Sequence, residues 1–283
     1  MKKYGWIFIL ALWASAAESK ILVHGHRGSR GTHPENTLPA FEEAVLAGAD
    51  VLELDLQLTK DNVPVIGHDF LISEPLCQPQ KIKMSLPQPI RLLTLEQVLS
   101  FDCGSTVLEK FPGQTRVPGT AMPSLEQFFV WASTRAPRLQ FNIETKMEAE
   151  ATFVPDPELF VSRVLELIRK FGVADRTILQ SFDFRMLAVA RKKEPGLRLA
   201  CLFKDERNFC ELTKRFGSTI ASPNFELVTR LEMRKCKSDG IQVFPWTVNR
   251  PGDWRRLIQL GVDGLITDYP RNLINFLKAL GNG

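Results

Sequence analysis

Short β-rich runs alternate with helical patterns along most of this 283-residue chain, and the alternation limits the folds open to it. The candidate strands cover residues 21–26, 51–58, 64–67, 139–144, 177–181, 197–203, 219–222, 241–247 and 264–267; helical patterns between them include 38–47, 157–171, 184–193, 225–237, 251–260 and 272–280. About eight β-then-α units of this kind predict a parallel sheet. A doubly wound open sheet would give a similar alternation, but no G-x-G-x-x-G follows a strand. We therefore expect an α/β protein with a (β/α)8 TIM barrel.

Residues 70–123 interrupt the alternation after the third candidate strand. They contain seven prolines and one good helical pattern, at 95–99. A stretch this long without regular structure, inside a compact domain, is typical of a lid or a binding loop. We interpret it as an insertion over the mouth of the barrel and not as a second domain.

Residues 1–17 have the pattern of a secretory signal peptide. Lys2 and Lys3 precede an apolar run at 6–13, and small residues follow at 14–17. The run is shorter than the ~20 residues of a membrane-spanning helix, so we expect no stable insertion into a membrane. The barrel domain is then 18–283, in a periplasmic or secreted protein. The alternative is an uncleaved amphipathic start of the fold.

Charge and cysteine content exclude two classes of site. The net charge is +4 with scattered basic residues, so the chain has no stripe of the kind that binds nucleic acid. The five cysteines form no zinc pattern and cannot all pair within one chain. In an exported protein Cys77 and Cys103 could form a disulfide. Buried free thiols fit the other three, Cys201, Cys210 and Cys236, at least as well.

Two candidate strands carry carboxylates on one face. Because side chains alternate along a strand, Glu53 and Asp55 lie opposite a row of leucines, and Glu144 occupies a similar position in 139–144. Unpaired charges inside a barrel are costly, and a cation would offset that cost. Three carboxylates suit one divalent cation, Mg²⁺ or Ca²⁺, better than zinc. The alternative is an amphipathic strand with one face in water. Lys146 could bind an anionic substrate or pair with Glu144.

Two histidines end candidate strands, where the active sites of barrel enzymes are built. His26 and His68 can each accept and release a proton near neutral pH, so the pair predicts one general base and one general acid. Arg27 offers a planar set of donors that matches phosphate oxygens. The alternative for Arg27 is an ion pair with Glu35 or Asp55.

These residues belong to a series of motifs that resembles the glycerophosphodiester phosphodiesterase family. The series runs from about residue 21 to the end in the family's order: His26-Arg27-Gly28, Pro34-Glu35-Asn36-Thr37, Glu53-Leu54-Asp55, His68-Asp69, Asn142-Ile143-Glu144-Thr145-Lys146, Gln180-Ser181-Phe182, Ser222-Pro223, Trp246-Thr247-Val248-Asn249, Gly261-Val262-Asp263-Gly264 and Thr267-Asp268-Tyr269-Pro270. One tripeptide is weak evidence, but the whole series is specific. Thr145 stands where an aliphatic residue is common, which affects no catalytic position.

The resemblance implies a site and a reaction. One divalent cation is bound by Glu53, Asp55 and Glu144; His26 and His68 form the acid–base pair; and Arg27 and Lys146 lie near the phosphate. The implied reaction is hydrolysis of a small-molecule glycerophosphodiester to sn-glycerol 3-phosphate and an alcohol. The glycerol 2-hydroxyl attacks phosphorus, and water then opens the cyclic phosphate while the histidines exchange roles.

The other polar candidates have secondary roles. Glu35 and Asn36 are expected to support the site by hydrogen bonding. Gln180 and Trp246 could line the glycerol or the head-group side, and Trp246 could equally be core packing. We expect a structural role for His24, an N-cap role for Asp268 and no role for His33.

Two other functions stay open. The first is phospholipase D-type hydrolysis of lysophospholipids or sphingomyelin, which requires an exposed apolar collar formed by Leu71, Ile72, Leu76, Ile82, Met84, Leu86 and Ile90. The second is a non-catalytic protein that binds phosphodiesters. The presence of both histidines and all three carboxylates argues against it, because binding alone needs neither an acid nor a base.

Overall fold

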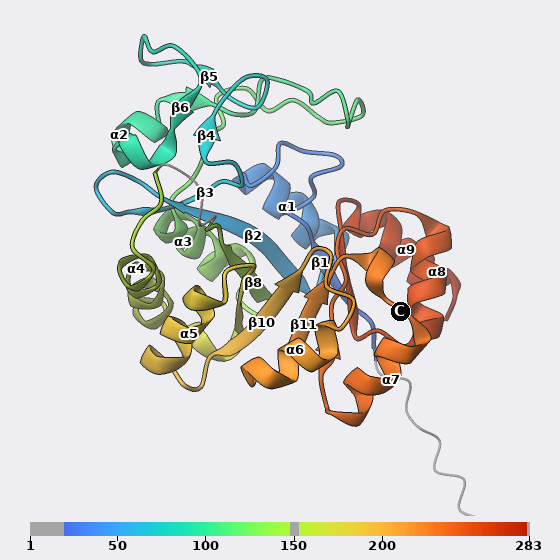
Figure 1. Cartoon of the computed structure of the whole chain (residues 1–283). Coiled ribbons are helices and arrows are strands. Elements are labelled where there is room, and N and C mark those ends of the chain that lie inside the picture. The colour runs from blue at the N-terminus through green and yellow to red at the C-terminus, as the bar shows by residue number, and fades with distance from the viewer. Residues whose placement is uncertain (1–19, 148–152, 282–283) are drawn as a thin grey trace, which may run out of the picture.

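The computed structural model describes residues 20–147 and 153–281, and the predicted signal peptide at 1–17 lies outside these ranges. Within them, eight parallel strands form a nearly closed barrel with helices around it, which confirms the predicted TIM barrel (Figure 1). The strands are β1 (Leu22–Gly25), β2 (Val51–Leu58), β8 (Gln140–Thr145), β9 (Thr177–Ser181), β10 (Arg198–Phe203), β11 (Ile220–Pro223), β12 (Gln242–Val243) and β13 (Gly264–Thr267).

The barrel closes between β12 and β13. The hydrogen-bonded order is β12-β11-β10-β9-β8-β2-β1-β13, and the two end strands meet through individual backbone bonds. The Asp263 amide donates to the Val243 carbonyl at 3.1 Å, and the Ile266 amide to the Pro245 carbonyl at 3.1 Å. All eight carboxyl ends therefore lie around one rim.

The candidate strand at 64–67 is not part of the barrel. β3 (Pro64–Ile66) pairs antiparallel with the end of β2, with Leu56 opposite Ile66. The intervening turn is closed by a 3.1 Å bond from the Thr59 amide to the Val63 carbonyl. This hairpin returns the chain to the rim, so His68 lies at the mouth although it follows no barrel strand.

Helices cover the outside of the barrel. They are α1 (Leu38–Ala47), α3 (Leu125–Arg135), α4 (Pro157–Lys170), α5 (Phe184–Lys193), α6 (Phe209–Phe216), α7 (Arg230–Ser238), α8 (Pro251–Leu260) and α9 (Pro270–Ala279). No helix was predicted for α3 or α6. The leucines of β2 are fully buried in the same core as Phe41 of α1 and Phe128 of α3, so the opposite face of β2, with Glu53 and Asp55, points into the barrel. No helix of the described residues combines the length and apolarity needed to cross a bilayer.

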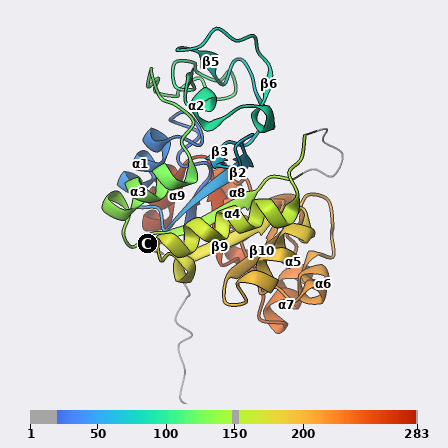
Figure 2. The same cartoon turned by 90° about the vertical axis from the view of Figure 1, so that its left-hand side faces the viewer.

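Residues 70–123, called the small lobe below, stand at one end of the barrel (Figures 1 and 2). The lobe contains β4 (Leu71–Ile72), β5 (Gln78–Pro79), β6 (Gln88–Pro89), the 3-10 turn Ile90–Leu92, α2 (Leu95–Val98), where a helix was predicted, and β7 (Phe101–Asp102). Most of its apolar residues face inward. Of the seven proposed for a collar, Leu71 is exposed at 41%, Ile72 and Ile90 are buried, and the others are partly buried. The collar that phospholipase D-type action on lysophospholipids would require is therefore not formed.

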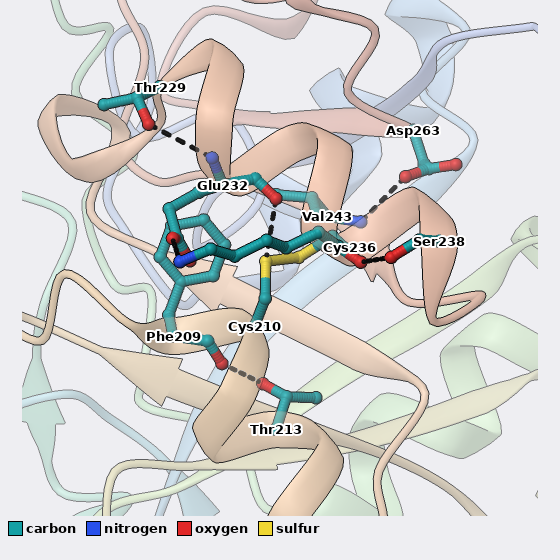
Figure 3. Close-up of a disulfide and its surroundings, with 10 residues drawn as sticks. Phe209, Cys210, Thr213, Thr229, Glu232, Cys236, Ser238, Val243 and Asp263 are labelled. Atoms are coloured by element: carbon teal, nitrogen blue, oxygen red, sulfur yellow. Dashed lines mark hydrogen bonds and ion pairs between the residues drawn. A yellow bond between two sulfur atoms is a disulfide. The ribbon is translucent and has the colours of Figure 1, made fainter.

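Two disulfides join neighbouring elements. The Cys77–Cys103 bridge, which the sequence left open, is present in the small lobe. A second bridge, Cys210–Cys236, connects α6 to α7, so the alternative of buried free thiols does not hold for these two cysteines (Figure 3). These helices follow the adjacent strands β10 and β11, and each turns one cysteine toward the other helix. Cys201 is a buried free thiol, as expected.

Candidate active site

A cavity of about 230 Å³ opens at the carboxyl ends of the barrel strands. Its walls include His26, Arg27, Glu53, Asp55, His68, Glu144, Lys146, Gln180 and Trp246. Glu35 and Asn36 are buried directly behind Arg27 and Asp55 and form hydrogen bonds with them. The structure thus brings together side chains that are separated by more than two hundred positions in the sequence.

Three buried carboxylates form the floor of this cavity. One oxygen each of Glu53, Asp55 and Glu144 lies within 4.8 Å of the others, and the β2–β8 register places Asp55 opposite Glu144. Burial and the charges of its two neighbours raise the pKa of Glu53 well above its ordinary value. Burial also raises the pKa of Glu144, although Lys146 opposes this. Hard oxygen ligands that repel one another fit a divalent cation such as Mg²⁺ or Ca²⁺.

Amide groups hold these carboxylates in place. Glu53 accepts hydrogen bonds from the Arg27 backbone amide at 2.9 Å and from Gln180 Nε2 at 3.0 Å. Asp55 accepts one from Asn36 Nδ2 at 2.9 Å. Gln180, predicted to contact substrate, therefore also orients Glu53. Asn36 supports the site as expected.

The turn after β1 directs His26 and Arg27 into the site. Arg27 and Gly28 have left-handed backbone conformations, with φ of 48° and 83°. A Cβ on Gly28 would lie 2.5 Å from the backbone carbon of Ala40 in α1, so only glycine fits. This tight packing explains why a glycine follows His26 and Arg27.

Arg27 and Lys146 bring positive charge to the carboxylates. The Arg27 guanidinium pairs with Glu35 and lies 3.2 Å from Asp55, so the ion pairs that sequence reasoning left open exist. Lys146 Nζ lies 2.8 Å from Glu144 Oε1. Although burial opposes it, the charge of Glu144 raises the pKa of Lys146, which keeps its ammonium charged. Both side chains line the cavity, where a phosphate group could contact them.

His26 has an anionic partner that sequence reasoning missed. Asp268 was expected to cap α9, but Tyr269 occupies that position. The Asp268 carboxylate instead lies 2.6 Å from His26 Nδ1 and accepts a 2.6 Å hydrogen bond from Asn249 Nδ2. Burial alone would raise the pKa of Asp268, but the charge and hydrogen bond of His26 lower it to about 2. The ionised carboxylate keeps the proton on Nδ1, which leaves Nε2 for chemistry.

His68 has a similar arrangement, built from its own chain neighbour. Its Nδ1 lies 2.7 Å from Asp69 Oδ1, and the hydrogen bond from His68 lowers the pKa of Asp69. Gln57 Nε2 donates to the His68 carbonyl at 3.0 Å and fixes the main chain. Each histidine at the cavity therefore has a carboxylate on Nδ1.

The remaining wall of the cavity is largely apolar and includes residues that were not predicted. Phe182 packs edge-to-face on Trp246 with ring centroids 5.5 Å apart, and Leu202 and Ile266 lie beside them. Trp246 Nε1 donates to the Ser222 carbonyl at 2.7 Å, which fixes its ring. Trp246 was a candidate from the sequence and Phe182 belongs to one of the motifs, whereas Leu202 and Ile266 are apolar residues in apolar runs that no sequence pattern marked as cavity residues.

Three other basic side chains, Arg30, His24 and His33, differ in their relation to the cavity. Arg30, also missed, lines the cavity, pairs with Glu35 and lies 5.0 Å from the centroid of the Phe111 ring in the small lobe. His24 packs against Phe244 inside the barrel, and burial lowers its pKa to about 3, which agrees with a structural role. His33 does not line the cavity.

Comparison with known proteins identifies the family. The model of the glycerophosphoryl diester phosphodiesterase family matches residues 26–272. The chain belongs to this family. Among its relatives, a glycerophosphodiester phosphodiesterase of Caldanaerobacter subterraneus subsp. tengcongensis is 30% identical over 93% of this chain and 100% of that protein. A lysophospholipase D of Rattus norvegicus is 26% identical over 90% of this chain and 85% of that protein.

Solved structures agree with this family assignment. A crystal structure from Silicibacter pomeroyi DSS-3 has a TM-score of 0.86 and 27% identity, and covers 93% of this chain and 95% of that chain. A phosphodiesterase of Oleispira antarctica, solved in complex with the product sn-glycerol-3-phosphate, has a TM-score of 0.77 at 20% identity, covering 92% and 97% of the two chains. At 20% identity, the similarity to the Oleispira antarctica structure shows a shared fold and nothing more.

Replacing Asp268 tests its effect on His26. Burial lowers the pKa of His26, and Asp268 opposes that shift. In Asp268→Asn the pKa of His26 should fall further, so the acid limb of kcat/KM against pH moves to lower pH. Loss of the Nδ1–H tautomer should also reduce kcat by about 10²–10⁴-fold. Asp263→Asn, at the opposite end of β13, is the control, and an unshifted acid limb in Asp268→Asn would contradict the assignment.

Replacing Glu53 tests the cation site independently of turnover. Glu53→Gln removes a buried charge that its neighbours repel, so in EDTA the variant should be more stable than the wild type by about 0.5–2 kcal/mol. Added Mg²⁺ or Ca²⁺ should raise the free energy of unfolding of the wild type but not of the variant. Urea unfolding measures both effects, with Glu126→Gln on the surface of α3 as the control. A variant that keeps the full cation effect would remove Glu53 from the ligand set.

Proposed function

We propose that this enzyme hydrolyses glycerophosphodiesters to sn-glycerol 3-phosphate and an alcohol through acid–base catalysis by His26 and His68. The observation that carries the proposal is that two imidazoles, each with a carboxylate on Nδ1, share one cavity with three buried carboxylates and Lys146. The family assignment and the names of the relatives support the same reaction.

The two histidines divide the proton transfers. Burial lowers the pKa of His26, so its Nε2 is free at neutral pH to take the proton of the attacking glycerol 2-hydroxyl. As the new P–O bond forms, the bond from phosphorus to the head-group oxygen breaks, and His68 donates a proton to that oxygen. In the second step His68 takes a proton from water as the water oxygen attacks phosphorus. The bond from phosphorus to the glycerol 2-oxygen then breaks, and His26 returns its proton to that oxygen.

The basic side chains of the cavity, and the carboxylates by holding a cation, would together balance the negative charge of the substrate phosphate. Glu53, Asp55 and Glu144 would hold Mg²⁺ or Ca²⁺, which when bound supplies positive charge for the phosphoryl oxygens. Lys146 and Arg27 line the same space and would orient the phosphate. Because Glu144 and Asp55 already pair with these two cations, their positions are fixed before substrate binds.

Release of sn-glycerol 3-phosphate from glycerophosphocholine tests the function directly. His26→Ala and His68→Ala should each reduce kcat by at least about 10²-fold, because each removes one proton transfer. Far-UV circular dichroism should be unchanged. His33→Ala, a histidine outside the cavity, is the matched control and should keep full activity. A near-normal rate in either catalytic variant would refute the role of that histidine.

Two further conditions of the same assay separate the rival functions. EDTA should stop turnover, and Mg²⁺ or Ca²⁺ should restore it. Lysophosphatidylcholine should be a poorer substrate than glycerophosphocholine, because most apolar residues of the small lobe pack inward and form no collar for an acyl chain. Faster turnover of lysophosphatidylcholine would favour the activity named for the rat relative. Tight binding without product would favour the non-catalytic function.

We also propose export to the periplasm or the medium. The N-terminal pattern supports it, and so do two disulfides within the described residues, because such bridges persist mainly in oxidising compartments. The chain expressed with its own N-terminus in a bacterial host should be recovered outside the cytoplasm without residues 1–17, as intact-mass measurement would show. Full-length protein in the cytoplasm would contradict this.

A further inference from the structure

The small lobe and the barrel meet at a catalytic residue, because His68 lies where the chain leaves one and enters the other. On the barrel side, the Gly67 amide donates to the Asp55 carbonyl and Gln57 Nε2 donates to the His68 carbonyl, both at 3.0 Å. On the lobe side, Gly67 and His68 border a narrow space whose other walls include Cys77, Cys103 and Met122. The His68 main chain thus lies between strand β2 and the Cys77–Cys103 disulfide.

The disulfide belongs to the lobe's apolar cluster. Cys77 and Cys103 are 0% and 5% exposed, and they pack with Val65 and Ile72, which precede and follow His68 in the chain. Directly beside the bridge, β5 pairs with β7, with Gln78 opposite Asp102. The bridge therefore joins the outgoing and returning parts of the lobe next to His68.

The side of the narrow space that Cys77, Cys103 and Met122 form is called the wall behind His68. The lobe has little other regular structure to keep this wall in place. Its strands are two residues long and its α-helix has four residues, so its backbone hydrogen bonds belong mostly to turns and isolated contacts and form no long ladder. Asn36, which holds Asp55, borders the same narrow space. Asn36 is also held from the barrel side by hydrogen bonds with Arg27 and Asp55, so movement of this wall would act on His68 and not on the carboxylates.

We propose that Cys77 and Cys103 are positioning residues for catalysis, whose disulfide fixes the wall behind His68 and so holds its imidazole in the cavity. The inference rests on the proposed function, in which His68 transfers protons. The other disulfide, Cys210–Cys236, does not border the space beside His68. Cys210–Cys236 connects two helices on the outside of the barrel, and neither cysteine borders the cavity (Figure 3).

The two disulfides provide a matched comparison. Both close a loop with a sequence separation of 26, so removing either one should release a similar entropy in the unfolded chain and lower stability to a similar degree. In Cys77→Ala/Cys103→Ala, kcat for glycerophosphocholine should fall by about tenfold to a hundredfold because the proton donor is displaced. KM should stay within about twofold, since Lys146 and Arg27 are unaffected. Cys210→Ala/Cys236→Ala should keep the wild-type kcat.

A His68→Ala background separates positioning from general damage. There, removing the Cys77–Cys103 bridge should reduce the residual turnover no further, because groups that act through one another are not additive. A multiplicative further loss would overturn the positioning role. Equal kcat in the two double-cysteine variants would also overturn it. So would loss of the barrel's cooperative unfolding in Cys77→Ala/Cys103→Ala, because the bridge would then be required by the whole fold.

The comparison also distinguishes the inference from the function on which it rests. A wild-type protein that releases no sn-glycerol 3-phosphate would contradict the proposed function and this inference together. A wild type that is active, with both double-cysteine variants equally active, would contradict the inference alone.

Discussion

Repulsion among three buried carboxylates is the interaction on which the site depends. Glu53, Asp55 and Glu144 approach one another within 4.8 Å on strands that have no face in water. Burying even one unpaired charge is costly, and three of the same sign are tolerated only beside compensating charges. Lys146 and Arg27 supply part of that compensation, and a divalent cation would supply the rest. The inner polar face of β2 is therefore explained by charge balance and not by exposure to solvent.

His26 and His68 each have a carboxylate at Nδ1, but their exposure to solvent differs. His26 and Asp268 are buried, with side chains 11% and 1% exposed, whereas His68 and Asp69 are 31% and 57% exposed. A buried imidazole loses its proton more readily, and an imidazole nearer to solvent can exchange protons with water. This asymmetry fits one histidine as the first base and the other as the group that protonates the leaving alcohol and later activates water.

Structural features that depend on neighbouring residues or on periodicity could be predicted from the sequence. Alternation of strands and helices predicted the barrel, and alternation along β2 and β8 predicted which carboxylates face inward. Features that depend on chain closure were not accessible. Asp268 meets His26 only because β13 returns to pair with β1, with Thr267 opposite Gly25. Likewise, Cys210 and Cys236 pair because α6 and α7 are neighbours in space. Their spacing alone does not distinguish a bridge from two buried thiols.

The run at 64–67 shows why strand prediction and site prediction can succeed or fail separately. Its composition predicted a strand correctly, but pairing direction depends on partners, and β3 runs antiparallel to β2. The hairpin nevertheless places His68 at the rim, as a parallel strand would have done. The consequence is a composite site: β1, β2 and β8 supply His26 and the carboxylates from a rigid ring, whereas the second histidine is positioned by a hairpin and a lobe. Under the proposed mechanism, the packing of the lobe, although remote from the phosphate, would contribute to the geometry of proton transfer.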